Sequence, residues 1–187
     1  MKILIKGGRV IDPANHLDRV CDILTQGQTI ARVGDHLETE ADQVIDAAGK
    51  LVMPGILDMH VHLREPGRED KETIASGTRA ALKGGITSVL AMPNTLPAID
   101  SVENVERLKE SIREGACAQV FMAGAITRQR QGEQLTDIAG LKRAGVVAIT
   151  DDGDSVDSDA LMQEALQSAQ EAGMLVICHS EDKKLAR

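Results

Sequence analysis

Residues 55–67 read GILDMHVHLREPG, an apolar run that ends in two histidines one residue apart and continues into an arginine and a Glu-Pro-Gly turn. On an extended strand, the side chains of residues i and i+2 point to the same side. His60 and His62 can therefore offer two imidazole nitrogens to one cation, while Val61 faces away and packs against a helix. The stretch predicts a β-strand that ends at a metal site.

The sequence after this stretch repeats a strand-like run at a regular interval. Apolar, β-prone runs begin at Ile56, Ile86, Ala118, Val146 and Met174, at intervals of 30, 32, 28 and 28 residues. Helical patterns lie between these runs, and in the second helix Asp100 and Glu103 suit an N-cap pair. Because a strand, a helix and a strand at this interval form the βαβ unit of a parallel sheet, the pattern predicts an α/β fold over residues 54–187.

The first 53 residues predict a separate β-rich segment. Their short apolar runs alternate with turn glycines at Gly27 and Gly49, and Pro54 with Gly55 marks the boundary. We expect residues 1–53 to form a small β-sheet or sandwich segment and residues 54–187 to form the α/β part. His16 and His36 lie in the first segment, outside the register of the strand ends, and are predicted to be surface residues.

Composition excludes several classes of partner. The 187-residue chain has a formal net charge of −8, and Phe121 is its single aromatic residue. Nucleic-acid surfaces instead require basic faces and often aromatic stacking platforms. Three cysteines are too few for a disulfide framework, and no apolar run approaches the roughly 18 residues that suggest a membrane-spanning helix. We therefore expect a protein of the reducing cytoplasm that binds neither nucleic acid nor membrane.

Reactive side chains recur where the predicted strands end. Asn94 follows the second strand, Asp151 and Asp152 follow the fourth, and His179 ends the fifth. Parallel α/β folds bind ligands at the carboxyl ends of their strands. A carboxylate such as Asp152 can bridge two cations, and a metal pair suits hydrolysis of an amide-like bond. For Asp151 the alternative is a carboxylate that only caps a loop.

Two further features of this region have plainer interpretations. Cys178 alternates with His179 and is predicted to face the helix layer as a small hydrophobe, with a functional thiol as the alternative. The acidic run at 151–159 is not a calcium loop of the EF-hand type, since Val156 and Asp157 occupy positions that need Asp or Asn and then Gly.

Strand count alone leaves the architecture open. Five strands could complete a doubly wound open sheet, whereas an eight-stranded barrel needs roughly 250 residues.

Four motifs together carry a resemblance to a known family. They are GILDMHVHLREPG at 55–67, AMPNT at 91–95, ITDDG at 149–153 and CHSED at 178–182. The chain resembles the amidohydrolase superfamily throughout its length, and within it most closely the bacterial class I dihydroorotases. The resemblance implies the N-terminal part of a metal-dependent (β/α)8 TIM barrel, with strands one to five present, preceded by a segment of a small β-sandwich built from both chain ends.

The resemblance also implies a role for each site residue. His60 and His62 would hold a first zinc ion, Asp152 would bridge to a second, and His179 would hold that second ion. Arg64, His62 and Asn94 would bind the substrate. A guanidinium matches a carboxylate bidentately, although Arg64 could instead be a surface arginine bonded to Glu65 or Asp70.

The family's catalytic aspartate and a further histidine ligand would follow residue 187. No catalytic acid or base is therefore expected in this stretch, and we interpret the chain as the N-terminal portion of a longer enzyme.

The implied activity is that of a zinc-dependent hydrolase acting on cyclic amides. It would interconvert dihydroorotate and N-carbamoyl-aspartate in pyrimidine biosynthesis. Allantoinase and hydantoinase or dihydropyrimidinase remain alternatives, although VVAITDDG lacks the lysine that usually bridges the metals in hydantoinases. A non-catalytic homologue that partners a carbamoyltransferase, and a homo-oligomer, also remain open.

Overall fold

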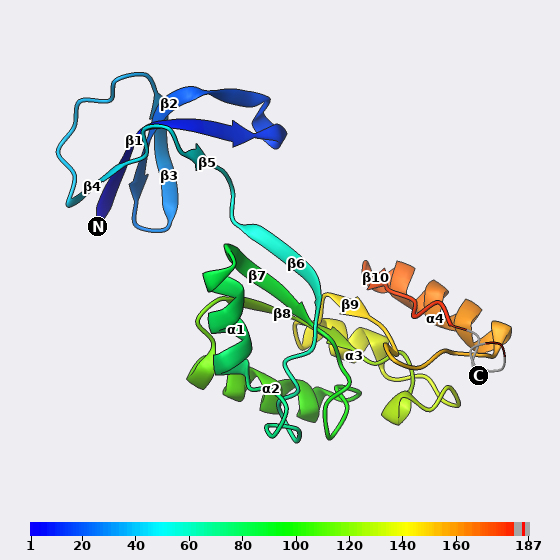
Figure 1. Ribbon diagram of the computed structural model, residues 1–187. Helices are drawn as coiled ribbons and strands as arrows, with labels where there is room; N and C mark the ends of the chain where they lie inside the picture. The colour runs from blue at the N-terminus through cyan, green and yellow to red at the C-terminus, as the bar shows by residue number, and fades with distance from the viewer. Residues whose placement is uncertain (182–184, 186–187) are drawn as a thin grey trace. The chain divides into compact units, whose positions relative to one another are not determined.

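The computed structural model describes residues 1–181 and 185 (Figure 1). The chain divides into two compact units, Met1–Pro54 and Gly55–Arg187. No helix among the described residues is long and apolar enough to cross a membrane.

The first unit is a five-stranded sheet. Its elements are β1 (Lys2–Asp12), the short helix η1 (Pro13–Asn15), β2 (Leu17–Gln26), β3 (Thr29–Gly34), β4 (Gln43–Asp46) and β5 (Leu51–Val52). The strand order is β3-β2-β1-β4, and β5 also pairs with β1. Gly27, with a φ of 62°, makes the tight turn between β2 and β3 that the sequence predicts. That this sheet belongs to a composite sandwich stays a prediction.

A buried carboxylate holds the first unit together. Asp22 on β2 is 5% exposed, and its two oxygens accept hydrogen bonds from the backbone N–H groups of Gly7 and Leu37, both at 2.9 Å. The Gly7 bond, helped by the Leu37 bond, lowers the pKa of Asp22 against the opposing effect of desolvation. The predicted surface histidines, His16 and His36, are both exposed, which confirms that prediction.

The second unit is a parallel five-stranded sheet with helices packed against it. The strands are β6 (Ile56–Val61), β7 (Ile86–Ala91), β8 (Gln119–Gly124), β9 (Ala148–Ile149) and β10 (Leu175–Val176). The helices are α1 (Ile74–Lys83), α2 (Val102–Gly115), the short η2 (Arg128–Arg130), α3 (Ile138–Arg143) and α4 (Asp159–Ala172). The strand order, β10-β9-β8-β7-β6, follows the chain, and every neighbouring pair is parallel. A strand forms in each of the five predicted runs.

The two faces of this sheet differ. One face packs against all four α-helices through a large core that includes Ile74, Val89, Val105, Leu141 and Ala165. The opposite face has large apolar side chains that stay exposed among the described residues: Leu57, Met59, Phe121, Val147 and Leu175. Val61 packs against the helix-side core, as predicted for a residue that faces away from the two histidines.

The cap of α2 differs from the prediction by one residue. Ser101, not Asp100, is the N-cap, and its hydroxyl oxygen accepts from the N–H of Asn104 at 3.3 Å. Asp100 instead accepts from the side chain of Asn104 at 3.0 Å and from the N–H of Gln129 at 2.9 Å. Asp100 therefore contacts the loop after β8 instead of capping α2, and the local sequence does not predict this contact.

Candidate metal centre

Three of the four predicted metal ligands meet at the carboxyl ends of the strands. His60 and His62 come from the end of β6, and Asp152 follows β9. Their ligand atoms all lie within 4.8 Å of one another. Nε2 of His60 is 3.2 Å from Oδ1 of Asp152, and Nε2 of His62 is 3.5 Å from Oδ2. Both imidazoles thus face one carboxylate.

Backbone pairing between the strands fixes this meeting point. The N–H of Met92 donates to the carbonyl of Val61 at 2.9 Å, which ties the end of β6 to the end of β7. The N–H of Thr150 donates to Gly124 at 2.9 Å and ties the end of β9 to the end of β8. The side chain of Thr150, fully buried, then accepts from the N–H of Asp152 at 3.1 Å. The site is therefore built on the sheet.

The chemistry of this donor set fits a divalent metal ion. Asp152 has a side chain that is 7% exposed and is the group toward which both imidazole nitrogens point. Neutral imidazole and carboxylate are the common protein ligands of zinc, and three such ligands leave a fourth position for water or substrate. The same ligands also accept cobalt or manganese, so they do not specify the metal.

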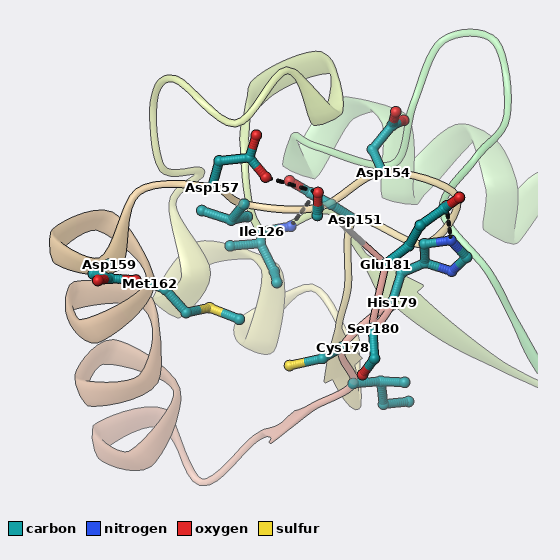
Figure 2. A pocket seen from close by; sticks show the side chains of 13 residues that line it. Ile126, Asp151, Asp154, Asp157, Asp159, Met162, Cys178, His179, Ser180 and Glu181 are labelled. Atoms are coloured by element: carbon teal, nitrogen blue, oxygen red, sulfur yellow. Dashed lines mark hydrogen bonds and ion pairs between the residues drawn. The ribbon is translucent and has the colours of Figure 1, made fainter. Parts of the chain in front are cut away.

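His179 lies beside the same carboxylate but outside the group of three. Its Nδ1 is 3.5 Å from Oδ1 of Asp152, while its Nε2 is 2.9 Å from Oε2 of Glu181 (Figure 2). A carboxylate that holds the far nitrogen of a ligating histidine orients the ring and raises its basicity. Sequence reasoning missed this contact of Glu181 with His179. The only local signal is its position two residues after His179.

Asn94 contacts the candidate centre through His62. Oδ1 of Asn94 is 3.0 Å from Nδ1 of His62. Because Nε2 of His62 faces Asp152, this contact suits the tautomer in which Nδ1 carries the proton and donates to Asn94. Asn94 therefore orients a candidate ligand, a role that its place after β7 does not reveal.

Arg64 does not make the surface contacts that its alternative interpretation requires. Glu65 accepts from the N–H of Ile74 at 2.8 Å, and Asp70 lies 3.9 Å from Nε of Arg68. Among the described residues, the Arg64 guanidinium has neither an ion pair nor a hydrogen bond. Arg64 itself is half-buried and has a φ of 62°, a left-handed conformation.

Asp151 has the structural role offered as its alternative. It is 2% exposed and accepts from the N–H groups of Ile126 at 2.8 Å and Thr127 at 3.1 Å, and from the Thr127 hydroxyl. Burial raises the pKa of Asp151, against the lowering effect of these hydrogen bonds. The carboxylate thus ties the loop after β8 to the loop after β9.

A pocket of about 440 Å³ flanks the centre (Figure 2). Its lining includes Asp151, His179 and Met162 of α4. Cys178 lines it too, with its sulfur directed toward the Met162 side, and is exposed. Cys178 thus points toward the helix layer as predicted, but it is not packed there as a small hydrophobe, because the chain after β10 lines this pocket and leaves the side chain exposed.

Comparison with known proteins places these features in context. A family model described as "Dihydro-orotase-like" matches residues 49–187. A dihydroorotase from Elusimicrobium minutum and one from Pelotomaculum thermopropionicum are each 50% identical over 186 residues, which cover 100% of this chain and 43% of theirs. The chain thus spans less than half the length of these curated relatives.

Solved structures of hydantoinases share the fold. The L-hydantoinase (dihydropyrimidinase) from Arthrobacter aurescens gives a TM-score of 0.86 at 23% identity, over 97% of this chain and 41% of that one. The D-hydantoinase (dihydropyrimidinase) from Thermus sp. gives 0.76 at 28% identity, over 98% and 41%. The predicted fold class is confirmed: a β-sheet segment followed by a five-stranded parallel half-barrel.

Proposed function

The chain belongs to the dihydro-orotase-like family, and from this premise we propose that the protein catalyses reversible hydrolysis of the ring amide of dihydroorotate to N-carbamoyl-aspartate. The observation that carries the proposal is the convergence of His60, His62 and Asp152 in a chain 50% identical to named dihydroorotases. Because the chain spans 43% of those relatives, the activity is proposed for the protein as a whole.

The candidate ligands lie at the strand ends, and the resemblance to dihydroorotases assigns them to two metal ions. His60 and His62 would hold a first zinc ion, Asp152 would bridge, and His179 would hold a second ion. All three histidines have a ring nitrogen within 3.5 Å of the Asp152 carboxylate, His60 and His179 at Oδ1 and His62 at Oδ2, which supports Asp152 as the ligand that the two ions would share. Zinc bound there would acidify water to supply a nucleophile near neutral pH and would polarise a carbonyl group.

Arg64 and Asn94 are proposed to bind the substrate carboxylate. The Arg64 guanidinium has no partner among the described residues, and its fork of N–H groups matches a carboxylate. Oδ1 of Asn94 is taken by His62, while its amide nitrogen has no acceptor in the described part of the chain. The amide nitrogen of Asn94 can donate a hydrogen bond to the substrate while Oδ1 of Asn94 stays bonded to His62. His62 would therefore contribute to substrate binding indirectly, by holding Asn94 in place.

Dihydroorotate is favoured over the substrates of the structural neighbours. The stretch VVAITDDG contains no lysine, and Asp152 follows β9 as the carboxylate that His60 and His62 face. An aspartate bridge, together with an arginine for the substrate carboxylate, is the combination implied for dihydroorotases, and Arg64 has no partner among residues 1–181. A non-catalytic homologue would be expected to lose ligands, whereas His60, His62, Asp152 and His179 are all present. A cytoplasmic location and association with a carbamoyltransferase or a second copy stay predictions.

The proposal is tested by assaying the whole protein with dihydroorotate, hydantoin and allantoin as alternative substrates. We expect hydrolysis of dihydroorotate to have the highest kcat/KM. His60→Ala should lose bound zinc and activity together, whereas His16→Ala, at an exposed histidine of the first unit, should keep both. Full activity and zinc content in His60→Ala, or a preference for hydantoin, would contradict the proposal.

A further inference from the structure

The loop between β8 and α3 reaches the main chain of Asp152 through one arginine. Nη1 of Arg130 donates to the backbone carbonyl of Asp152 at 2.6 Å and lies 3.1 Å from Oδ2 of Asp154. One cationic nitrogen therefore holds two points of the loop after β9. The first point is the backbone of the residue whose carboxylate faces His60 and His62.

The backbone around Arg130 is strained. Gln129 and Arg130 have φ values of 53° and 60°, a left-handed conformation that residues with a Cβ seldom adopt and that persists where the surroundings fix it. Two contacts fix it here. The N–H of Gln129 donates to Oδ2 of Asp100 at 2.9 Å, and the N–H of Arg130 donates to the carbonyl of Thr127 at 3.0 Å.

The guanidinium of Arg130 is also incompletely satisfied. Its side chain is 21% exposed, and its Nε is buried without a hydrogen-bond partner in the part of the chain that the structure describes. A buried N–H without an acceptor opposes folding. The left-handed backbone and the unsatisfied Nε of Arg130 both lower stability. Features that lower stability in this way cluster at functional sites.

We propose that Arg130 is a positioning residue for the candidate metal centre. Its Nη1 holds the main chain of Asp152, so that the carboxylate stays directed at His60 and His62. The inference rests on the proposed function, since it assumes a metal at that carboxylate. Groups that orient metal ligands typically change metal affinity or activity roughly 10- to 100-fold when they are replaced.

Three substitutions separate positioning from general loop structure. Arg130→Met removes the donor and keeps an unbranched stem. Arg130→Lys keeps one cationic nitrogen, and because a single nitrogen makes both contacts, it should restore part of the effect. Arg128→Met is the matched control, since Arg128 lies on the same loop and is exposed.

The experiment is a titration of the whole protein with Co²⁺, in which binding is read from the visible absorption of the bound ion. Far-ultraviolet circular dichroism of each variant is the control for folding. Arg130→Met should weaken Co²⁺ binding by roughly tenfold or more and alter the spectrum, Arg130→Lys should be intermediate, and Arg128→Met should match wild type. If Arg130→Met changes the circular dichroism, Arg130→Gln replaces it with the same expectation.

Equal Co²⁺ affinity and spectra in wild type and the folded neutral variant would overturn the inference and leave the metal site standing. A wild-type chain that takes up no Co²⁺ would overturn the metal site and the inference with it.

Discussion

At the scale of single residues, Asp152 connects most of the candidate centre. Two imidazoles face it from β6, His179 approaches it after β10, and Arg130 holds its backbone. The sequence predicts the ligands because they recur at strand ends. It does not predict Glu181 or Arg130, because the contacts that give them a role depend on how two loops fold.

Replacement of Arg64 tests the substrate side. In the whole protein, Arg64→Met should lower kcat/KM roughly 10- to 100-fold, since a hydrogen bond to a charged group is worth about 1.5–3 kcal/mol. Zinc content should not change. Arg68→Met is the control, because Arg68 is a neighbouring arginine whose nearest charged partner is Asp70 at 3.9 Å. Unchanged kcat/KM in Arg64→Met would remove Arg64 from the site.

Thr78 offers a stability test in the helix layer. Its hydroxyl is fully buried, donates to the carbonyl of Ile74 at 2.6 Å and accepts from the N–H of Cys117 at 3.0 Å. Thr78→Val would leave the Cys117 N–H unsatisfied and should lower the free energy of unfolding by about 1–3 kcal/mol. Chemical denaturation measures this loss of unfolding free energy, and Thr87→Val, at an exposed threonine, is the control. Equal losses in both variants would contradict this role.

At the scale of elements, hydrophobic periodicity locates the strands but not their length. The run VVAIT predicts a strand over residues 146–150, yet only Ala148–Ile149 pair in β9. Val146 is buried in the helix-side core without being part of the ladder. An apolar run indicates which residues are buried. Residues buried against helices need not pair with a neighbouring strand, so the run is longer than the strand. The loop from β8 to α3 has no periodic signal, so its contacts with Asp151 and Asp152 could not be predicted.

The sheet of the first unit should lose stability in acid because of Asp22. Its pKa is lowered in the folded state, so its contribution is complete above the unfolded pKa of about 3.9 and disappears as the pH falls through the lower folded value. Asp22→Asn should therefore be less stable than wild type at neutral pH, and the difference should shrink below about pH 4. Denaturation curves at several pH values measure this, and a constant difference down to pH 2 would contradict it.

At the scale of the whole molecule, the apolar face of the five-stranded sheet is its most unusual feature. Leu57, Met59, Phe121, Val147 and Leu175 share that face and stay exposed among the described residues. Side chains from all eight strands fill the interior of a complete (β/α)8 barrel, so a sheet of five such strands leaves this apolar face uncovered. The family resemblance, and not the strand count, distinguishes the half-barrel from an open doubly wound sheet.

This face should bind an apolar dye in the isolated 187-residue chain. We expect the fluorescence of a naphthalene sulfonate probe to rise on mixing and to fall by about half when Met59 and Phe121 are both replaced by serine, because much of the apolar area is then lost. Val20→Ser, at an exposed apolar residue of the first unit, is the control. An equal dye signal in the double variant would show that the dye binds elsewhere.

The central claim is that His60, His62 and Asp152 bind a metal ion. Its most direct test is a crystal structure of the whole protein with zinc, with anomalous differences recorded at the zinc absorption edge. The account predicts a peak bonded to Nε2 of His60, Nε2 of His62 and the Asp152 carboxylate, with bonds of roughly 2.0–2.2 Å. Zinc bound elsewhere, with these three side chains unliganded at a saturating concentration, would contradict the metal centre and the function built on it.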